Sequence, residues 1–130
     1  MKMKNKRDGK PEGQKVYVYF NLHRKLWSVR ALDGPHKGRV IAHKRGVVLQ
    51  DVSPRVSQAG RERVLRERKK NVHAGLVGYW VPFNTPITEH MVPITYNPYK
   101  YESFVYVSDE SAYTGTRKAL LLNRQVRVSI

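Results

Sequence analysis

The feature that most constrains the fold is a series of short segments in which side chains of two kinds alternate, each segment ending in turn-forming residues. In the first, KVYVYF at residues 15–20, valine and phenylalanine alternate with tyrosine. Similar segments follow at residues 26–32, 39–44 and 46–52, separated by turn sequences such as NLHRK and DGPHKG. A period of two puts successive side chains on opposite faces of a sheet. These segments predict an antiparallel meander, and the chain lacks the strand–helix–strand spacing of a Rossmann-type fold.

One segment predicts a helix instead. The serine and proline at positions 53–54 are expected to end the strand before them. Ser57 is placed to cap a helix over about residues 58–70, and Asn71 is suited to end it in a left-handed conformation. Strand character resumes at residues 73–81.

The rest of the chain predicts further strands. Residues 82–98 are rich in prolines and are expected to form turns. Residues 99–108 and 119–130 are expected to close the fold as strands, with a loop at residues 109–118 between them. The expected fold class is α+β: a single, mostly antiparallel β-sheet domain over residues 15–130 with one basic α-helix.

The N-terminus and the amino-acid composition define the class of protein. Residues 1–14 contain five cations, glycines and a proline with almost nothing to bury, which predicts a disordered basic tail. The chain has no cysteine, which excludes a disulfide framework and cysteine zinc sites and fits a reducing cytoplasm. It has no apolar run that could span a bilayer and no secretory signal, so no membrane partner is expected.

The charge indicates an anionic partner. Lysine and arginine number 25 against 10 aspartates and glutamates, a formal net charge of +15 in 130 residues. A chain this basic repels itself, and a counter-charge from nucleic acid, nucleotide phosphates or an anionic surface relieves the repulsion. The alternative interpretation is a basic surface without a specific partner.

The residues expected of an enzyme are missing. The five histidines show no zinc-ligand spacing, and Asp109 and Glu110 are the only adjacent acids. No serine lies in a nucleophile elbow, and no glycine pattern matches a P-loop. The sequence therefore predicts a protein without catalytic activity, metal or cofactor.

Two groups of residues are candidates for binding an anion. In GRERVLRERKKNVHAGLVG, residues 60–78, planar arginine forks can grip phosphate oxygens in a bidentate manner. These arginines are Arg61, Arg63, Arg66 and Arg68. The alternative is a solvated helix in which Glu62 and Glu67 pair with arginines, although two acids cannot neutralise the set. In TGTRK, residues 114–118, Thr116 and Arg117 lie in a glycine loop that can close over a phosphate.

Aromatic residues form a third group of candidates. In ITYNPYKYESFVYV, tyrosines beside Asn97 and Lys100 can stack on a base, read its edge and hold a phosphate. Phe104 and Tyr106 are more simply interpreted as core residues. Tyr96 and Tyr99 flank a turn that should expose at least one of them.

Three motifs together resemble a known family. FNLHRKLWSV, RKKNVHA and ITYNPYKY followed by FV are similar to motifs of the first type of Thoeris anti-defence proteins, which are small phage-encoded proteins. The resemblance covers residues 15–107; the lysine-rich leader and the C-terminal LLLNRQVRVSI lie outside it. It implies a homo-oligomer in the cytoplasm of an infected bacterium. It also implies that the chain sequesters cyclic signalling nucleotides, such as cyclic ADP-ribose isomers or cyclic oligonucleotides, and so blocks immunity without catalysis.

The resemblance also implies roles for individual residues. Those expected to bind phosphate are Arg61, Arg63, Thr116 and Arg117, and those expected to bind base and ribose are Phe83, Tyr96, Asn97 and Tyr99. Two alternatives remain. The same helix and the lysine-rich tail can bind DNA or RNA backbones independently of sequence, or the chain can be a structural phage or ribosome-associated protein.

Overall fold

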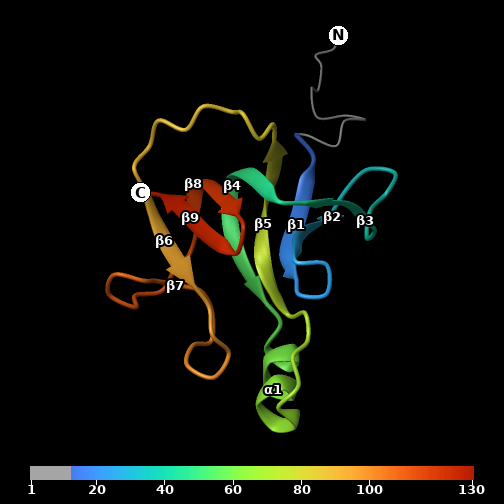
Figure 1. Ribbon diagram of the computed structural model, residues 1–130, viewed down its shortest axis with the longest axis vertical. Coiled ribbons are helices and arrows are strands. Elements are labelled where there is room, and N and C mark those ends of the chain that lie inside the picture. The colour runs from blue at the N-terminus through green and yellow to red at the C-terminus, as the bar shows by residue number, and fades with distance from the viewer. Residues whose placement is uncertain (1–12) are drawn as a thin grey trace.

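Nine strands form one antiparallel sheet in the computed structural model, which describes residues 13–130 (Figure 1). Their order across the sheet is β3-β2-β1-β5-β4-β8-β9-β6-β7. The strands are β1 Lys15–Asn21, β2 Leu26–Ala31, β3 Val40–Lys44, β4 Gly46–Val56, β5 Ala74–Val81, β6 Met91–Thr95, β7 Val105–Tyr106, β8 Thr116–Leu122 and β9 Gln125–Ser129. The single helix among these residues, α1 Gln58–Glu67, joins β4 to β5. The α+β class and the antiparallel sheet are confirmed.

The alternating pattern of the first strand defines the two faces of the sheet. Val16 and Val18 are fully buried on the inner face, and Phe20 pairs there with Trp27 of β2. Tyr17 and Tyr19 point to the outer face, where they pack with each other. Because the side-chain period of a strand is two, the register of β1 decides which residues enter the core.

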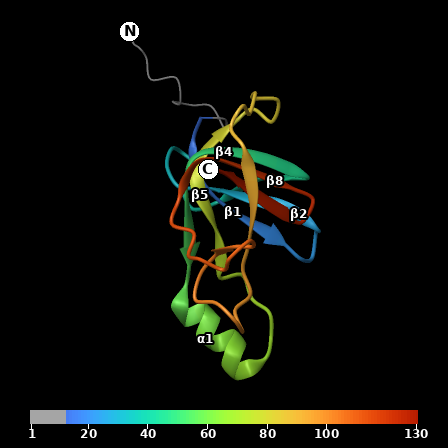
Figure 2. The same cartoon turned by 90° about the vertical axis from the view of Figure 1, so that its left-hand side faces the viewer.

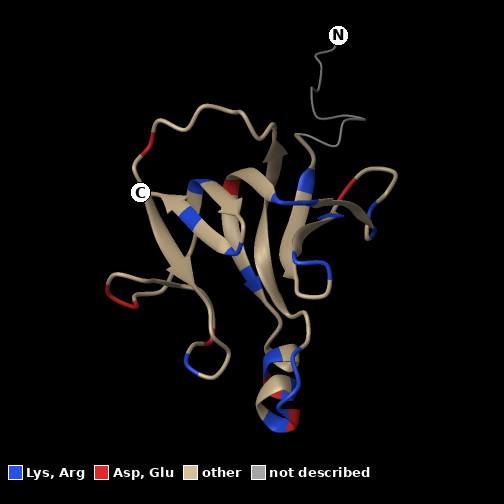
Figure 3. Ribbon diagram, in the orientation of Figure 1, with Lys and Arg blue, Asp and Glu red and all other residues tan. Residues whose placement is uncertain are grey.

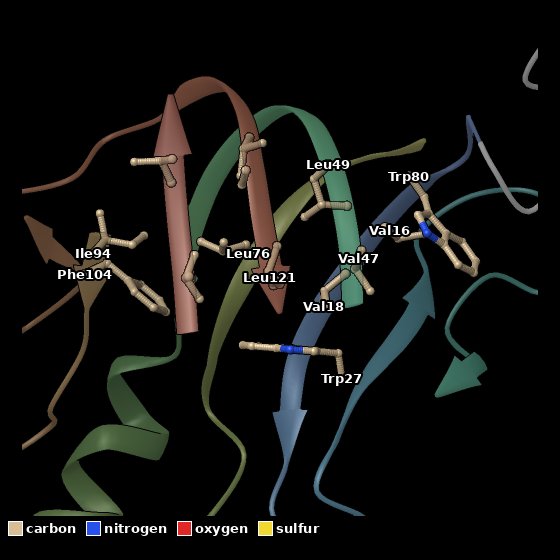
Figure 4. Packing of buried hydrophobic residues seen from close by; sticks show 14 of the residues in the cluster. Val16, Val18, Trp27, Val47, Leu49, Leu76, Trp80, Ile94, Phe104 and Leu121 are labelled. Carbon is tan, nitrogen blue, oxygen red and sulfur yellow. The ribbon is translucent and has the colours of Figure 1, made fainter. Parts of the chain in front are cut away.

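The core lies on the inner side of a strongly curved sheet. Residues from β1 and β2 on one side and from β6, β8 and β9 on the other belong to one buried cluster (Figure 4). Leu49, Leu76 and Leu121 are essentially inaccessible in its centre. Each buried leucine of this kind contributes about 1.5–3 kcal/mol relative to an exposed one.

Strand β4 runs further than the sequence predicts. It continues through Pro54, which pairs with Leu76, and ends at Val56. The prediction that the serine–proline pair ends the strand is wrong because the ladder between β4 and β8 stops at Val52 and Thr116. Beyond that point β4 pairs, within residues 13–130, with β5 alone, and an edge position tolerates a residue without an N–H.

Helix α1 begins as predicted and ends early. The Ser57 hydroxyl accepts a hydrogen bond from the Gly60 amide at 3.1 Å, which confirms the cap. The helix stops at Glu67, because Arg68 takes the left-handed conformation with φ of 59° and donates its amide to the Val64 carbonyl. The left-handed stop at Asn71 and the extension to residue 70 are therefore wrong.

The C-terminal part differs most from expectation. Residues 82–98, predicted to be turns, contain β6, whereas residues 99–108, predicted to be a strand, contribute only the two residues of β7. Residues 119–130 form most of the hairpin β8–β9, which turns at Asn123 in a left-handed conformation.

Order begins before Lys15. The Gln14 carbonyl accepts from the Trp80 amide at 2.9 Å, and the Gly13 amide bonds to the Trp80 carbonyl. These two bonds extend the β1–β5 pairing to residues 13 and 14, which the sequence assigns to the tail. Residues 1–12 of the predicted tail lie outside the described residues. No helix in residues 13–130 is long and apolar enough to cross a membrane.

Candidate functional site

Helix α1 and the loop between β6 and β7 lie side by side at one end of the molecule (Figure 1 and Figure 2). Two side chains of the helix bond to the backbone of this loop. Arg61 Nε donates to the Pro98 carbonyl at 2.9 Å, and Gln58 Nε2 donates to the Glu102 carbonyl at 2.9 Å. We call α1 and residues 97–102 together the helix–loop platform.

The loop of the helix–loop platform is held by a turn centred on Asn97. Its side-chain Oδ1 accepts from the Tyr99 amide at 2.9 Å, and its backbone carbonyl accepts from Lys100 at 3.0 Å and Tyr101 at 2.8 Å. Tyr99 is 54% exposed. The structure therefore brings Arg61, Asn97 and Tyr99 together, three residues that the sequence proposes for one site.

Tyr96 is anchored at the base of α1. Its hydroxyl lies 2.7 Å from His73 Nε2, and His73 Nδ1 faces Asn71 Oδ1 at 2.9 Å. Because Asn71 Nδ2 donates to the Gly60 carbonyl, Oδ1 is the atom turned to His73. Nδ1 therefore donates to Asn71 Oδ1, and in this tautomer Nε2 accepts from the Tyr96 hydroxyl. Burial raises the pKa of Tyr96, and the charge of Arg61 opposes that rise.

A cavity of about 550 Å³ opens on the inner face of the sheet. It lies between β1, β2 and β5 on one side and β6 and β9 on the other. Its lining includes five aromatic residues and two arginines, namely Tyr19, Phe20, Trp27, Tyr96, Phe104, Arg124 and Arg127. Arg124, in the turn between β8 and β9, places its guanidinium carbon 5.0 Å from the centre of the Phe20 ring. None of the described residues that line the cavity is acidic.

Lysines and arginines gather on α1 and on the segment that follows it, with few acidic residues among them (Figure 3). Glu67 lies 3.8 Å from both Arg63 and Arg66, and all three side chains are well exposed. Exposed pairs of this kind contribute little to stability. Among the described residues, Arg68 and the two lysines after it have no carboxylate within ion-pair distance.

Phe83 lies at the opposite end of β4 from the platform. Its ring covers Gly46, where a Cβ atom would lie only 2.5 Å from Phe83 Cε1. Gly46 begins β4 and Val56 ends it next to α1, a separation of roughly 30 Å in an extended strand. The structure therefore does not bring Phe83 together with Arg61.

Thr116 and Arg117 belong to β8, so the glycine loop expected at residues 114–118 is mostly strand. Thr116 Oγ1 lies 2.9 Å from the Tyr113 hydroxyl. The pKa of Glu89 is lowered by a hydrogen bond from its own amide, then by the charges of Lys118 and Arg117. Within residues 13–130, no hydrogen bond or ion pair joins Thr116 or Arg117 to the helix–loop platform.

The sequence analysis does not predict a binding role for Arg124, or for Phe20 and Trp27 on the inner face of β1 and β2. The alternation of residues 15–20 does place Phe20 on the same face as the core valines. The position of Arg124 opposite that ring depends on the pairing of distant strands, and no local signal indicates it. Within residues 13–130, no three histidine, aspartate or glutamate side chains are grouped to hold a metal ion.

Comparison with known proteins gives one family. The family model of the Mycobacterium phage L5 gene 82 protein matches residues 9–129. The gene 82 protein of Mycobacterium phage L5 is 39% identical over 127 residues, which cover 92% of this chain and 98% of the phage protein. No solved structure matches. Neither match names a Thoeris anti-defence protein, so the motif resemblance remains a hypothesis about function.

Proposed function

This chain belongs to the family of the Mycobacterium phage L5 gene 82 protein, and from that premise we propose that it binds an anionic cyclic nucleotide in the inner-face cavity. In this proposal the ligand is a signalling nucleotide of bacterial anti-phage immunity, as the resemblance to the Thoeris anti-defence proteins implies. The chain holds it unchanged and keeps it from its receptor. The observation that carries the proposal is the cavity, which combines aromatic walls with a guanidinium and has no acidic residue in its described lining.

The size and chemistry of the cavity fit such a ligand. Small-molecule sites typically measure about 300–1,000 Å³ and combine apolar walls with a few polar groups. The rings of Phe20, Tyr96 and Phe104 offer surfaces for a base. The Arg124 fork offers charge-assisted hydrogen bonds to a phosphate. No carboxylate of the described lining opposes the negative charge of the ligand.

The same lining supports binding without chemistry. Hydrolysis requires a base, a nucleophile or a metal close to the scissile bond. The Tyr96 side chain brings a phenol to the lining, and burial raises the pKa of this phenol, so it is protonated at neutral pH. A neutral phenol is a weak base and a weak nucleophile.

The test is calorimetry of the full chain against cyclic ADP-ribose isomers and cyclic dinucleotides. Arg124→Gln should weaken binding about tenfold or more, because a charge-assisted phosphate contact is lost. Arg39→Gln, at an exposed arginine between β2 and β3, is the matched control and should bind normally. Ligand recovered after heat denaturation should be intact. Absence of saturable binding to every cyclic nucleotide, or full affinity in Arg124→Gln, would refute the proposal.

A second candidate function is sequence-independent binding of DNA or RNA. The unneutralised cations after Glu67 favour it, because phosphate contacts of this kind release counterions and depend strongly on salt. Removal of residues 1–12, which carry five cations, should lower nucleic-acid affinity and reduce its salt dependence. Cyclic-nucleotide binding should stay the same after this truncation, because the cavity is formed by later residues. Identical nucleic-acid affinity with and without residues 1–12 would exclude a contribution of the tail.

A further inference from the structure

Tyr99 presents an exposed ring next to the cations of α1. We infer that the helix–loop platform binds single-stranded nucleic acid, with Tyr99 stacked on an unpaired base and the neighbouring cations on phosphates. This inference rests on the second candidate function, and it is independent of the cavity, which Tyr99 does not line.

The Tyr99 ring is exposed on an ordered backbone. Tyr99 is 54% exposed, yet its amide is bonded to Asn97 Oδ1 at 2.9 Å. Pro98 restricts the backbone before it, and the Pro98 carbonyl is held by Arg61. A ring on a fixed backbone loses little conformational entropy when it stacks, so preorganisation favours binding.

Cations lie on the same platform as this ring. The Arg61 side chain uses Nε for the Pro98 carbonyl, and its two terminal nitrogens have no acceptor among the described residues. Lys100 follows Tyr99 directly in the loop. Arg68 caps the C-terminal end of α1, and among the described residues it has no carboxylate within ion-pair distance. Arg61 and Lys100 therefore offer positive charge to phosphates beside a base that stacks on Tyr99, and Arg68 adds charge at the far end of the helix.

An exposed ring distinguishes single-stranded from double-stranded nucleic acid. In a duplex both faces of each base are covered by neighbouring base pairs, and an exposed side chain reaches only the backbone and the groove edges. A single strand offers free base faces, and aromatic platforms beside basic residues are typical of proteins that bind it without sequence preference. The exposed ring favours single strands, whereas cations alone would bind both forms.

The experiment measures fluorescence anisotropy of the full chain with labelled oligothymidylate of about 16 nucleotides, and with a duplex of the same length. Tyr99→Ala should weaken binding of the single strand about tenfold and leave duplex binding unchanged. Tyr99→Phe should restore binding, because the ring is kept. Leu22→Ala, at an exposed apolar residue between β1 and β2, is the control for loss of exposed apolar surface. Arg68→Gln should weaken both forms and lower the salt dependence.

The outcomes separate the inference from the function on which it rests. If Tyr99→Ala binds the single strand as tightly as the unmodified chain while Arg68→Gln weakens both forms, the chain binds polyanions and the stacking inference is wrong. If neither oligonucleotide binds at low salt, nucleic-acid binding and the inference both fail. Thermal unfolding of each variant shows that the fold is kept; Tyr99 is exposed, so its replacement should leave the midpoint unchanged.

Discussion

The hydroxyl of Tyr96 lies 2.7 Å from Nε2 of His73, and this hydrogen bond ties β6 to the segment that leads from α1 into β5. His73 is only 9% exposed, so its ring nitrogens depend on protein partners. One partner is Asn71, and the other is the Tyr96 hydroxyl.

Tyr96→Phe should therefore destabilise the fold although it keeps the ring. It leaves His73 Nε2 without a donor in a buried place, which costs about 1–3 kcal/mol. Urea unfolding followed by circular dichroism measures the change in the free energy of unfolding. Tyr99→Phe, which removes an exposed hydroxyl, should stay within about 0.5 kcal/mol. Equal stability of the two variants would mean that this hydrogen bond is not formed in solution.

Gly60→Ala should destabilise the protein, against the usual effect of this change in a helix. Alanine normally stabilises a helix interior by about 1 kcal/mol relative to glycine. At Gly60, however, a Cβ atom would lie 2.5 Å from the Cβ atom of His73. We expect a net loss of about 1–3 kcal/mol from the forced displacement of α1. The thermal midpoint measures it, and a rise in the midpoint would contradict the close packing of α1 on His73.

Arg61→Ala should loosen the loop of the helix–loop platform. It removes the hydrogen bond to the Pro98 carbonyl, which is worth about 1–3 kcal/mol for a charged donor. Amide hydrogen exchange should accelerate at Lys100 and Tyr101, whose amides are bonded to the Asn97 carbonyl. Arg63→Ala, which removes an exposed ion pair, should leave both exchange rates unchanged. Equal amide exchange rates at Lys100 and Tyr101 in the two variants would show that the loop keeps its conformation without the hydrogen bond from α1.

Stability should fall in alkaline solution because of buried tyrosines. Burial raises the pKa of Tyr17 and of Tyr113 above the ordinary value near 10. Above about pH 10 the unfolded chain releases these protons while the folded chain keeps them, so the free energy of unfolding decreases as pH rises. The stability that these two tyrosines contribute is fully present at pH values below their pKa in the unfolded chain. It is lost as the pH rises through their higher pKa in the folded chain.

Tyr113→Phe is the variant that isolates this effect. It has no phenol to titrate at position 113, so its free energy of unfolding should decline less steeply between about pH 9 and pH 11. Denaturant unfolding at several pH values measures the slope. A slope identical to that of the unmodified chain would mean that Tyr113 titrates alike in both states.

The sequence predicted the parts of the fold that depend on local pattern. The alternation around Val16 and Val18 gave the faces of β1, and Ser57 gave the start of α1. Strand β6 was missed because Pro93 is normally depleted in strands. Pro93 is accommodated in β6 because it needs no N–H at this position. Its carbonyl accepts a hydrogen bond from the Val107 amide, just beyond the short β7.

The candidate site was predictable only in part. Residue type alone makes Arg61 a candidate for phosphate binding and Tyr99 a candidate for base stacking. The structure places their segments in contact. The order in which β9 and β6 follow β8 in the sheet creates the cavity and brings Arg124 to Phe20. Such order is set by contacts between residues far apart in the chain, about which local propensity contains no information.

Tyr96 connects the cavity with the base of α1. Its ring lines the cavity, and its hydroxyl is hydrogen-bonded to His73 next to the helix. A molecule that shifts this ring must also strain the attachment of the helix. Thermodynamic linkage makes such an effect mutual: whatever factor a cavity ligand imposes on binding at the helix, a helix ligand imposes on the cavity. A single phenol would thus set the sign and the size of the coupling between the two surfaces.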